Sequence, residues 1–316
     1  MEYCQVLNTF LTKRLLLLVL AFAVYPAQSH EQQQEAYAYT ETSNILEQFW
    51  ELDSDSKRGL YTLRTFQPNY VLPYHYTNNI NSQPASPTRG PVEAVDQYKD
   101  HEMKLQFSFR TKVLEDFLFH NADLWVAYTQ TSLWQAWNKD ISRPFRSTDH
   151  NPDIFYVIPL SQTFDLIPGE LGLEMVRVGL AHHSNGQSKP ASRSWNYWHV
   201  SSAITLGPVL LESTYKHRVN EPLEKDDNPD LIRYQGNLET SMTALIGRST
   251  VSLERSGEYF SMERGNWKLN VTYPLSRSQV GGVRVQLQVF SGYGETLLDY
   301  NHRQTRVGIG FLLLNI

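Results

Sequence analysis

Several stretches of the chain alternate apolar and polar side chains with a period of two residues. In residues 104–113, Leu105, Phe107 and Phe109 share one parity, and polar residues occupy most of the alternate positions. The same alternation recurs in residues 267–275, 283–289 and 307–313. A period of two over seven or more residues predicts β-strands whose two faces contact different environments.

Two all-β architectures produce this alternation. A soluble sandwich buries the apolar face in a core, whereas an outer-membrane barrel turns the apolar face to lipid and keeps the polar face in its lumen. The segments approach the ~9–11 residues that a tilted membrane strand needs. The 18 Tyr, 14 Phe and 7 Trp residues also suit the aromatic girdles at membrane interfaces. We therefore favour a transmembrane antiparallel β-barrel, with the sandwich as the alternative.

The N-terminus predicts export. Lys13 and Arg14 precede eleven uninterrupted apolar residues, 15–25, a run too short to cross the ~30 Å hydrocarbon layer as a helix. A charged lead, a short apolar run and small residues near Ser29 are typical of a secretory signal peptide, which we assign to residues 1–29. Cys4 lies within that segment. The exported chain would then contain no cysteine and form no disulfide.

Residues 30–60 differ from the rest and are assigned to a periplasmic N-terminal segment, with the barrel over residues 61–316. Ile45, Leu46, Phe49 and Trp50 are spaced for one face of a short helix, for which Ser43 is a suitable N-cap. Pro-rich or charged stretches at 78–93 and 220–230 predict loops.

The candidate chemistry lies in residues 180–196. His182 and Ser184 are two residues apart, so on a strand their side chains share a face, while His183 points to the opposite face and is assigned a structural role. A hydroxyl nucleophile needs a base within hydrogen-bond reach, and the base needs a third group to orient it. Asn196 can supply that group if the chain reverses near Asn185 and returns on the next strand. Spacing alone makes this a weak signal.

Longer motifs strengthen the catalytic interpretation of His182, Ser184 and Asn196. Taken together, these motifs make the chain strongly resemble the outer membrane phospholipase A family. The resemblance extends from about Tyr61 to the C-terminus. It rests on His-His-Ser-Asn-Gly at 182–186, Ser-Arg-Ser-Trp-Asn at 192–196, Tyr-Thr-Gln at 128–130, Pro-Phe-Arg at 144–146, Asp-Asn-Pro-Asp at 227–230 and the hairpin at 291–310.

The resemblance implies a barrel of twelve strands with catalytic residues on its lipid-facing surface. It implies that Ser184 is the nucleophile, His182 the general base and Asn196 the residue that orients the histidine. The family uses calcium and acts as a homodimer. By the same resemblance, the backbone N–H of Gly186 stabilises the oxyanion, and Gln130 hydrogen-bonds across the dimer interface. The implied calcium ligands are Ser142, the main chain of Gln187, and Ser192.

The implied function is calcium-dependent hydrolysis of phospholipid and lysophospholipid acyl esters, at the A1 and A2 positions, in the outer membrane. Two alternatives remain at this stage, a passive outer-membrane channel and a structural barrel that has lost activity. The formal net charge of −5 gives no reason to expect a nucleic-acid partner.

Overall fold

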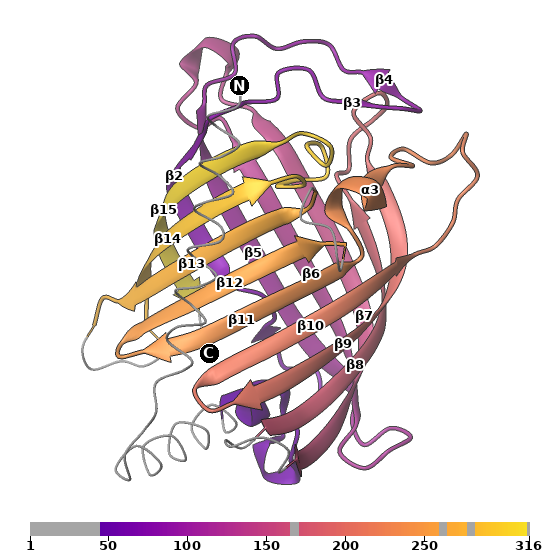
Figure 1. Cartoon of the computed structure of the whole chain (residues 1–316), viewed down its shortest axis with the longest axis vertical. Helices are drawn as coiled ribbons and strands as arrows, with labels where there is room; N and C mark the ends of the chain where they lie inside the picture. Colours follow the sequence, from indigo (N-terminus) through magenta and orange to yellow (C-terminus); the bar gives the residue numbers. More distant parts are fainter. Residues whose placement is uncertain (1–44, 165–170, 259–263, 277–281, 315–316) are drawn as a thin grey trace.

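The computed structural model describes residues 45–164, 171–258, 264–276 and 282–314. Its main feature is a closed antiparallel β-barrel of twelve strands, to which the two-residue strand β1 (Arg64–Thr65) adds at β5 (Figure 1). The barrel closes because β5 pairs with both β2 and β6. The predicted signal peptide, residues 1–29, and the predicted N-cap Ser43 lie outside the described residues.

The barrel strands run in sequence order, and every neighbour in sequence is a neighbour in space. They are β2 (Asn69–Thr77), β5 (His101–Leu114), β6 (Asp123–Trp134), β7 (Phe145–Phe164), β8 (Leu171–Ser184), β9 (Ser194–Leu206), β10 (Val209–Arg218), β11 (Leu238–Ile246), β12 (Ser249–Gly257), β13 (Asn266–Pro274), β14 (Arg284–Gly292) and β15 (Gln304–Leu314).

The connections at the two ends of the barrel differ in length. Tight turns such as 207–208 and 247–248 join strands at one end. Long segments fill the other end, where the loop at 78–100 carries β3 (Ala85–Ser86) and β4 (Gly90–Pro91), and α3 (Leu231–Gln235) follows β10 (Figure 1). The short 3-10 helix η2 (Lys139–Ile141) lies between β6 and β7 at this same end. The loops predicted at 78–93 and 220–230 both fall here.

The apolar and polar residues that alternate along the strands lie on opposite faces of the barrel wall. Phe107, Phe109 and Ile309 point outward, with exposed fractions between 40% and 54%. Lys104 and Arg306 point into the lumen and are almost fully buried. An exposed apolar exterior around a polar interior is the arrangement of a membrane barrel. The barrel prediction is confirmed, and the sandwich is excluded. None of the helices in the described ranges is long and apolar enough to cross a bilayer.

A helix at residues 45–50 lies at the end of the barrel opposite α3 (Figure 1). We call residues 45–58 the N-terminal plug. Leu46, Trp50 and Leu52 are at most 5% exposed and join one apolar cluster with inward-facing residues of the wall. The wall residues of that cluster are Trp125, Ala127, Phe155, Val157, Met175 and Ala203. Three residues of the predicted apolar face, Leu46, Phe49 and Trp50, therefore pack inside the barrel. The prediction is wrong for Ile45, which is 47% exposed.

Charged groups fasten the plug to the wall. Glu51 is fully buried and forms ion pairs with Arg64 at 2.6 Å and with Lys112 of β5 at 2.9 Å. Burial alone would raise the pKa of Glu51, but hydrogen bonds from Lys112 and Arg58 lower it below its usual value. The guanidinium of Arg110 lies 4.1 Å from the ring centre of Trp50, a cation–π contact.

We expect Leu46→Ala to destabilise the barrel by about 2 kcal/mol, because truncating a buried leucine loses apolar contacts and leaves a cavity. The measurement is the unfolding midpoint in urea, followed by tryptophan fluorescence. Ile45→Ala is the matched control, because Ile45 is 47% exposed on the same helix. Equal midpoints for the two variants would show that the plug does not contribute to stability.

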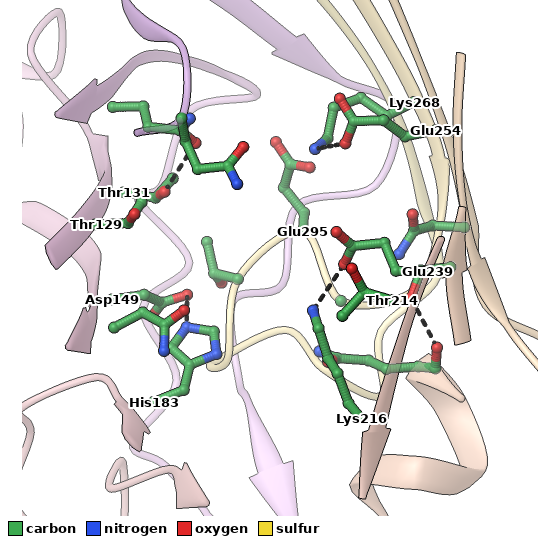
Figure 2. Close-up of a pocket in the computed structure, with 18 of the residues that line it drawn as sticks. Thr129, Thr131, Asp149, His183, Thr214, Lys216, Glu239, Glu254, Lys268 and Glu295 are labelled. Atoms are coloured by element: carbon green, nitrogen blue, oxygen red, sulfur yellow. Dashed lines mark hydrogen bonds and ion pairs between the residues drawn. The ribbon is translucent and has the colours of Figure 1, made fainter. Parts of the chain in front are cut away.

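The remaining lumen holds a polar cavity of ≈ 280 Å³. Ion pairs between neighbouring strands line this cavity. Lys216 of β10 pairs with Glu239 of β11 at 2.8 Å, and Lys268 of β13 pairs with Glu254 of β12 at 2.6 Å (Figure 2).

Candidate active site

The hairpin of β8 and β9 places the three predicted catalytic side chains on the outer face of the barrel. His182 pairs directly with Asn196, and Ser184 pairs with Ser194. Directly paired residues of an antiparallel ladder share a face. The intervening positions 183, 195 and 197 line the lumen cavity, so positions 182, 184 and 196 face outward. All three lie at the end of the barrel that carries the long loops.

A hydrogen bond joins two members of this group. The Nδ1 atom of His182 lies 2.8 Å from Oδ1 of Asn196. A carbonyl oxygen can only accept, so the proton is on Nδ1, and the Nε2 of a neutral imidazole is left as an acceptor. This tautomer is the one that a general base needs if it removes a proton through Nε2.

The side chain of Asn185, which is 3% exposed, bridges the two ends of the loop at 185–193. Its Oδ1 accepts from the backbone N–H of Arg193 at 2.9 Å, and its Nδ2 donates to the carbonyl of Ala191 at 2.8 Å. Gly186 follows with φ +63°, a conformation that glycine adopts without steric cost. The N–H of Gly186 donates to no group in the described part of the chain.

The Asp-Asp-Asn-Pro-Asp segment at 226–230 supports the same loop from a different part of the chain. Asn228 accepts from the backbone N–H of Ser194 at 3.1 Å. Asp227 accepts from Ser192 Oγ at 2.5 Å and from Arg89 Nε at 2.6 Å. These contacts hold the two motifs against each other in the fold.

The lumen side of the site carries charged and titratable side chains. His183 and Asp149 point into the lumen cavity (Figure 2), with Nε2 and Oδ2 3.9 Å apart, so the structural role assigned to His183 agrees with its position. The loop between β14 and β15 folds in behind them, where Asp299 forms an ion pair with Arg146 at 2.7 Å. Burial would raise the pKa of Asp299, but Arg146 lowers it to about 2, so this carboxylate stays ionised.

Gln130 lies on the outer face, away from the lumen, which Thr129 and Thr131 line instead. It pairs with His150 of β7, which in turn pairs with Ser184 of β8. The hydroxyl of Tyr128 joins the row, 3.2 Å from Gln130 Oε1 and 2.6 Å from His150 Nδ1. A band of polar groups thus extends from Gln130 to Ser184 across an otherwise apolar surface.

The three predicted calcium ligands lie in two loops that flank β7 and β8. Ser142 follows η2, and Gln187 and Ser192 belong to the loop at 185–193. Ser192 donates its hydroxyl proton to Asp227, which leaves the lone pairs of Oγ for a cation. Hydroxyl and carbonyl oxygens suit a hard cation such as calcium. The donor set fits the metal, although the described residues contain no cluster of three His, Cys, Asp or Glu side chains that could hold one.

The family model described as phospholipase A1 matches residues 46–313. The chain belongs to the phospholipase A1 family. A putative phospholipase A1 of Neisseria meningitidis serogroup B is 36% identical over 286 residues, which cover 86% of this chain and 71% of the relative.

Solved members of the family have the same fold. The outer membrane phospholipase of Salmonella typhi, a dimer with bound calcium, matches with a TM-score of 0.70 at 30% identity, over 81% of this chain and 94% of that one. An active-site mutant of Escherichia coli outer membrane phospholipase A, in which an asparagine is replaced by alanine, matches with a TM-score of 0.70 at 30% identity. The match covers 86% of this chain and 97% of that one. The predicted family, fold and outer-membrane location are confirmed.

Two residues near the site were missed by the sequence analysis. His150 carries no motif of its own, and its place beside Ser184 depends on the pairing of β7 with β8. Glu221 lies in the loop predicted at 220–230, and its carboxylate reaches Asn196 at 2.9 Å. A strand-pairing register would have located His150, whereas no local pattern indicates Glu221.

Proposed function

We propose that this phospholipase A1 family member hydrolyses the acyl ester bonds of phospholipids in the outer membrane, with Ser184, His182 and Asn196 as its catalytic triad. The observation that carries the proposal is the 2.8 Å hydrogen bond between His182 Nδ1 and Asn196 Oδ1, on the same outer face as Ser184. It fixes the base in its working tautomer beside a hydroxyl that makes no side-chain hydrogen bond within the described residues.

The reaction proceeds through an acyl-enzyme. His182 Nε2 takes the proton of Ser184 as Oγ attacks the ester carbonyl carbon, and the carbonyl oxygen becomes an oxyanion that accepts from the Gly186 N–H. Collapse of this intermediate breaks the ester C–O bond, and His182 returns the proton to the departing lysophospholipid oxygen. Water then attacks the acyl-serine with His182 again as base, which releases the fatty acid and restores Ser184.

Ser142, the carbonyl of Gln187 and the hydroxyl of Ser192 would hold the calcium ion. When bound, this ion supplies positive charge beside the developing oxyanion. Asp227 orients Ser192 through the 2.5 Å hydrogen bond, and Arg89 orients Asp227. Because Arg89 neutralises the charge of Asp227, the effect of this contact is to direct the lone pairs of Ser192 Oγ, and not to add net charge at the ion.

The outer wall provides a surface for acyl chains. Leu180 and Val178 precede His182 on the same face of β8 and are 61% and 43% exposed. Val200 adds a further exposed apolar side chain on β9, at 38%. Acyl chains can lie along this wall, and an open wall does not fix which of the two esters reaches Ser184. We therefore expect hydrolysis at both the A1 and A2 positions, and of lysophospholipids.

We also propose that the active form is a homodimer. Gln130, Tyr128 and His150 place polar atoms on a surface that contacts lipid. Gln130 accepts from Tyr128 and donates to Ser132, which leaves one N–H and one lone pair of its amide for a further partner, and unused hydrogen-bonding groups cost free energy in lipid. A second copy of the chain can pair with Gln130 and cover the polar band beside Ser184. The solved Salmonella typhi relative is a dimer.

A passive channel is the second candidate, and the lumen argues against it. Apolar residues of the plug pack against the wall inside one half of the barrel, and the buried ion pair between Arg146 and Asp299 lies in the other half. Barrel diameter grows with strand number, and small barrels are filled by side chains. Single-channel conductance in a planar bilayer would favour the channel.

The deciding experiment is fatty-acid release from detergent-dispersed phosphatidylcholine that carries a different acyl chain at each position. Mass spectrometry of the products should show both fatty acids, and their amounts give the ratio of A1 to A2 hydrolysis. Chemical cross-linking under the same conditions should show that release rises with the dimer fraction. A folded protein that releases neither fatty acid at any calcium concentration would support the inactive structural barrel instead.

Asn196→Ala is expected to lower kcat by about 10- to 100-fold without eliminating turnover. The alanine leaves His182 in place but removes the acceptor that sets its tautomer, so part of the general-base contribution is lost. The measurement is steady-state hydrolysis at saturating calcium. A rate equal to that of the wild type would remove Asn196 from the triad.

A further inference from the structure

The third member of the proposed triad has a charged partner of its own. Asn196 Nδ2 donates to Glu221 Oε1 at 2.9 Å, while Oδ1 of the same amide accepts from His182 at 2.8 Å. The carboxamide is therefore held at both ends, between a carboxylate and an imidazole. The arrangement is a hydrogen-bonded chain of Glu221, Asn196 and His182 that leads towards Ser184.

Backbone pairing brings Glu221 to this position. Beyond the last residue of β10, the N–H of Val219 donates to the carbonyl of Asn196 at 2.8 Å, so the chain continues alongside β9. Arg218 anchors the start of the loop through Asp226 at 2.6 Å and the carbonyl of Asn228 at 2.6 Å. Glu221 follows two residues after Val219 and is half-buried.

The two ends of an asparagine amide have opposite roles, and a histidine alone does not select between them. If NH₂ faced His182, Nδ1 would have to accept, and the ring proton would move to Nε2. Nε2 would then be unable to take a proton from Ser184. Glu221 removes this ambiguity, because an ionised carboxylate only accepts hydrogen bonds and therefore holds the NH₂ end.

The charge of Glu221 also compensates for the neutrality of the amide. A carboxylate next to the imidazole would stabilise the imidazolium that forms during catalysis, which asparagine does only weakly. Glu221 places a negative charge one hydrogen bond farther away and polarises the amide so that its oxygen becomes a better acceptor.

We propose that Glu221 is a positioning residue that keeps the Asn196 amide in its productive orientation and supports the charge on His182. This inference rests on the triad proposed above. It extends the triad by one residue, from a loop that no catalytic motif marks.

Glu221→Ala is expected to lower kcat roughly tenfold, the scale of one hydrogen bond to a charged group, and to leave KM within about twofold. The substrate should bind as before, because Glu221 acts through Asn196. The matched control is Glu224→Ala, which removes the same charge from the same loop. Among the described residues, Glu224 uses its backbone carbonyl, which accepts from Arg89, and its side chain has no recorded partner. Its alanine variant should therefore retain wild-type kinetics.

A double-mutant cycle separates positioning from a general effect on the loop. In an Asn196→Ala background, Glu221→Ala should cause no further loss, because the amide that it positions is absent. An unchanged kcat in the single variant, an equal fall in both backgrounds, or a change confined to KM would each overturn the proposal. Ser184→Ala in the same assay keeps the two proposals apart, because retained activity there would refute the triad itself.

Discussion

Ser184→Ala is expected to abolish fatty-acid release while leaving the barrel folded. The alanine cannot form the acyl-enzyme. In a Ser-His triad whose residues act together, removal of the serine lowers kcat by roughly 10⁶-fold. The side chain lies on the outer face near the end of β8, so its loss disturbs neither the backbone ladder nor the lumen. The measurements are hydrolysis at saturating calcium and the shift of the folded barrel on an unheated gel.

The structure offers a close control for that experiment. Ser194 is the residue of β9 that pairs directly with Ser184, so it places a second hydroxyl beside the first. Ser194→Ala should retain most of the activity, because Ser194 is not two residues from a histidine on its own strand. Full activity in Ser184→Ala, or loss confined to Ser194→Ala, would show that another group is the nucleophile.

The outer wall of the barrel was predictable because lipid and lumen impose opposite requirements on alternate residues. The period of two in residues 104–113 identifies both the strand and its lipid face, as the exposure of Phe107 and Phe109 shows. The same parity argument places His182 and Ser184 together. Register shifts interrupt strict pairing at several places, for example between β5 and β6 near Lys112 and between β7 and β8 near Pro159.

The lumen was not predictable, because its contacts join residues that are far apart in sequence. The helical spacing of Leu46 and Trp50 predicts an apolar face, but it does not reveal that this face packs against Phe155 and Met175 inside the barrel. Similarly, Glu102 of β5 forms ion pairs with both Arg146 and Arg306, from three strands. Only closure of the barrel brings these charges together.

The candidate site divides in the same way. The β8–β9 hairpin makes the pairing of His182 with Asn196 a local result, so the sequence could anticipate it. Glu221 is 25 residues from Asn196, in a loop whose path depends on Arg218 and Asp226. The roles of the three proposed calcium ligands stay predictions, because the fold shows only that the two loops that carry them flank β7 and β8.

Calcium removal is expected to lower kcat by about 10²- to 10³-fold and to be reversible. A neutral asparagine stabilises the imidazolium less than a carboxylate does, so more of the transition-state stabilisation must come from the oxyanion side. On the oxyanion side, the proposed mechanism assigns this chain a single donor, the Gly186 N–H. Loss of one further oxyanion stabiliser typically lowers kcat by about 10²- to 10³-fold. The measurement is the rate of hydrolysis in excess chelator and after calcium is restored.

Ser192→Ala tests whether the ion binds where we propose. The variant should need a higher calcium concentration for half-maximal activity, because it removes one oxygen ligand and the contact that orients it, the hydrogen bond to Asp227. Ser188→Ala is the matched control, since Ser188 is exposed in the same loop and only its backbone carbonyl is used, by Ala191. Undiminished hydrolysis in excess chelator would contradict the metal requirement. An unchanged calcium dependence in Ser192→Ala would instead place the ion elsewhere, since the proposed site cannot lose an oxygen ligand without losing affinity.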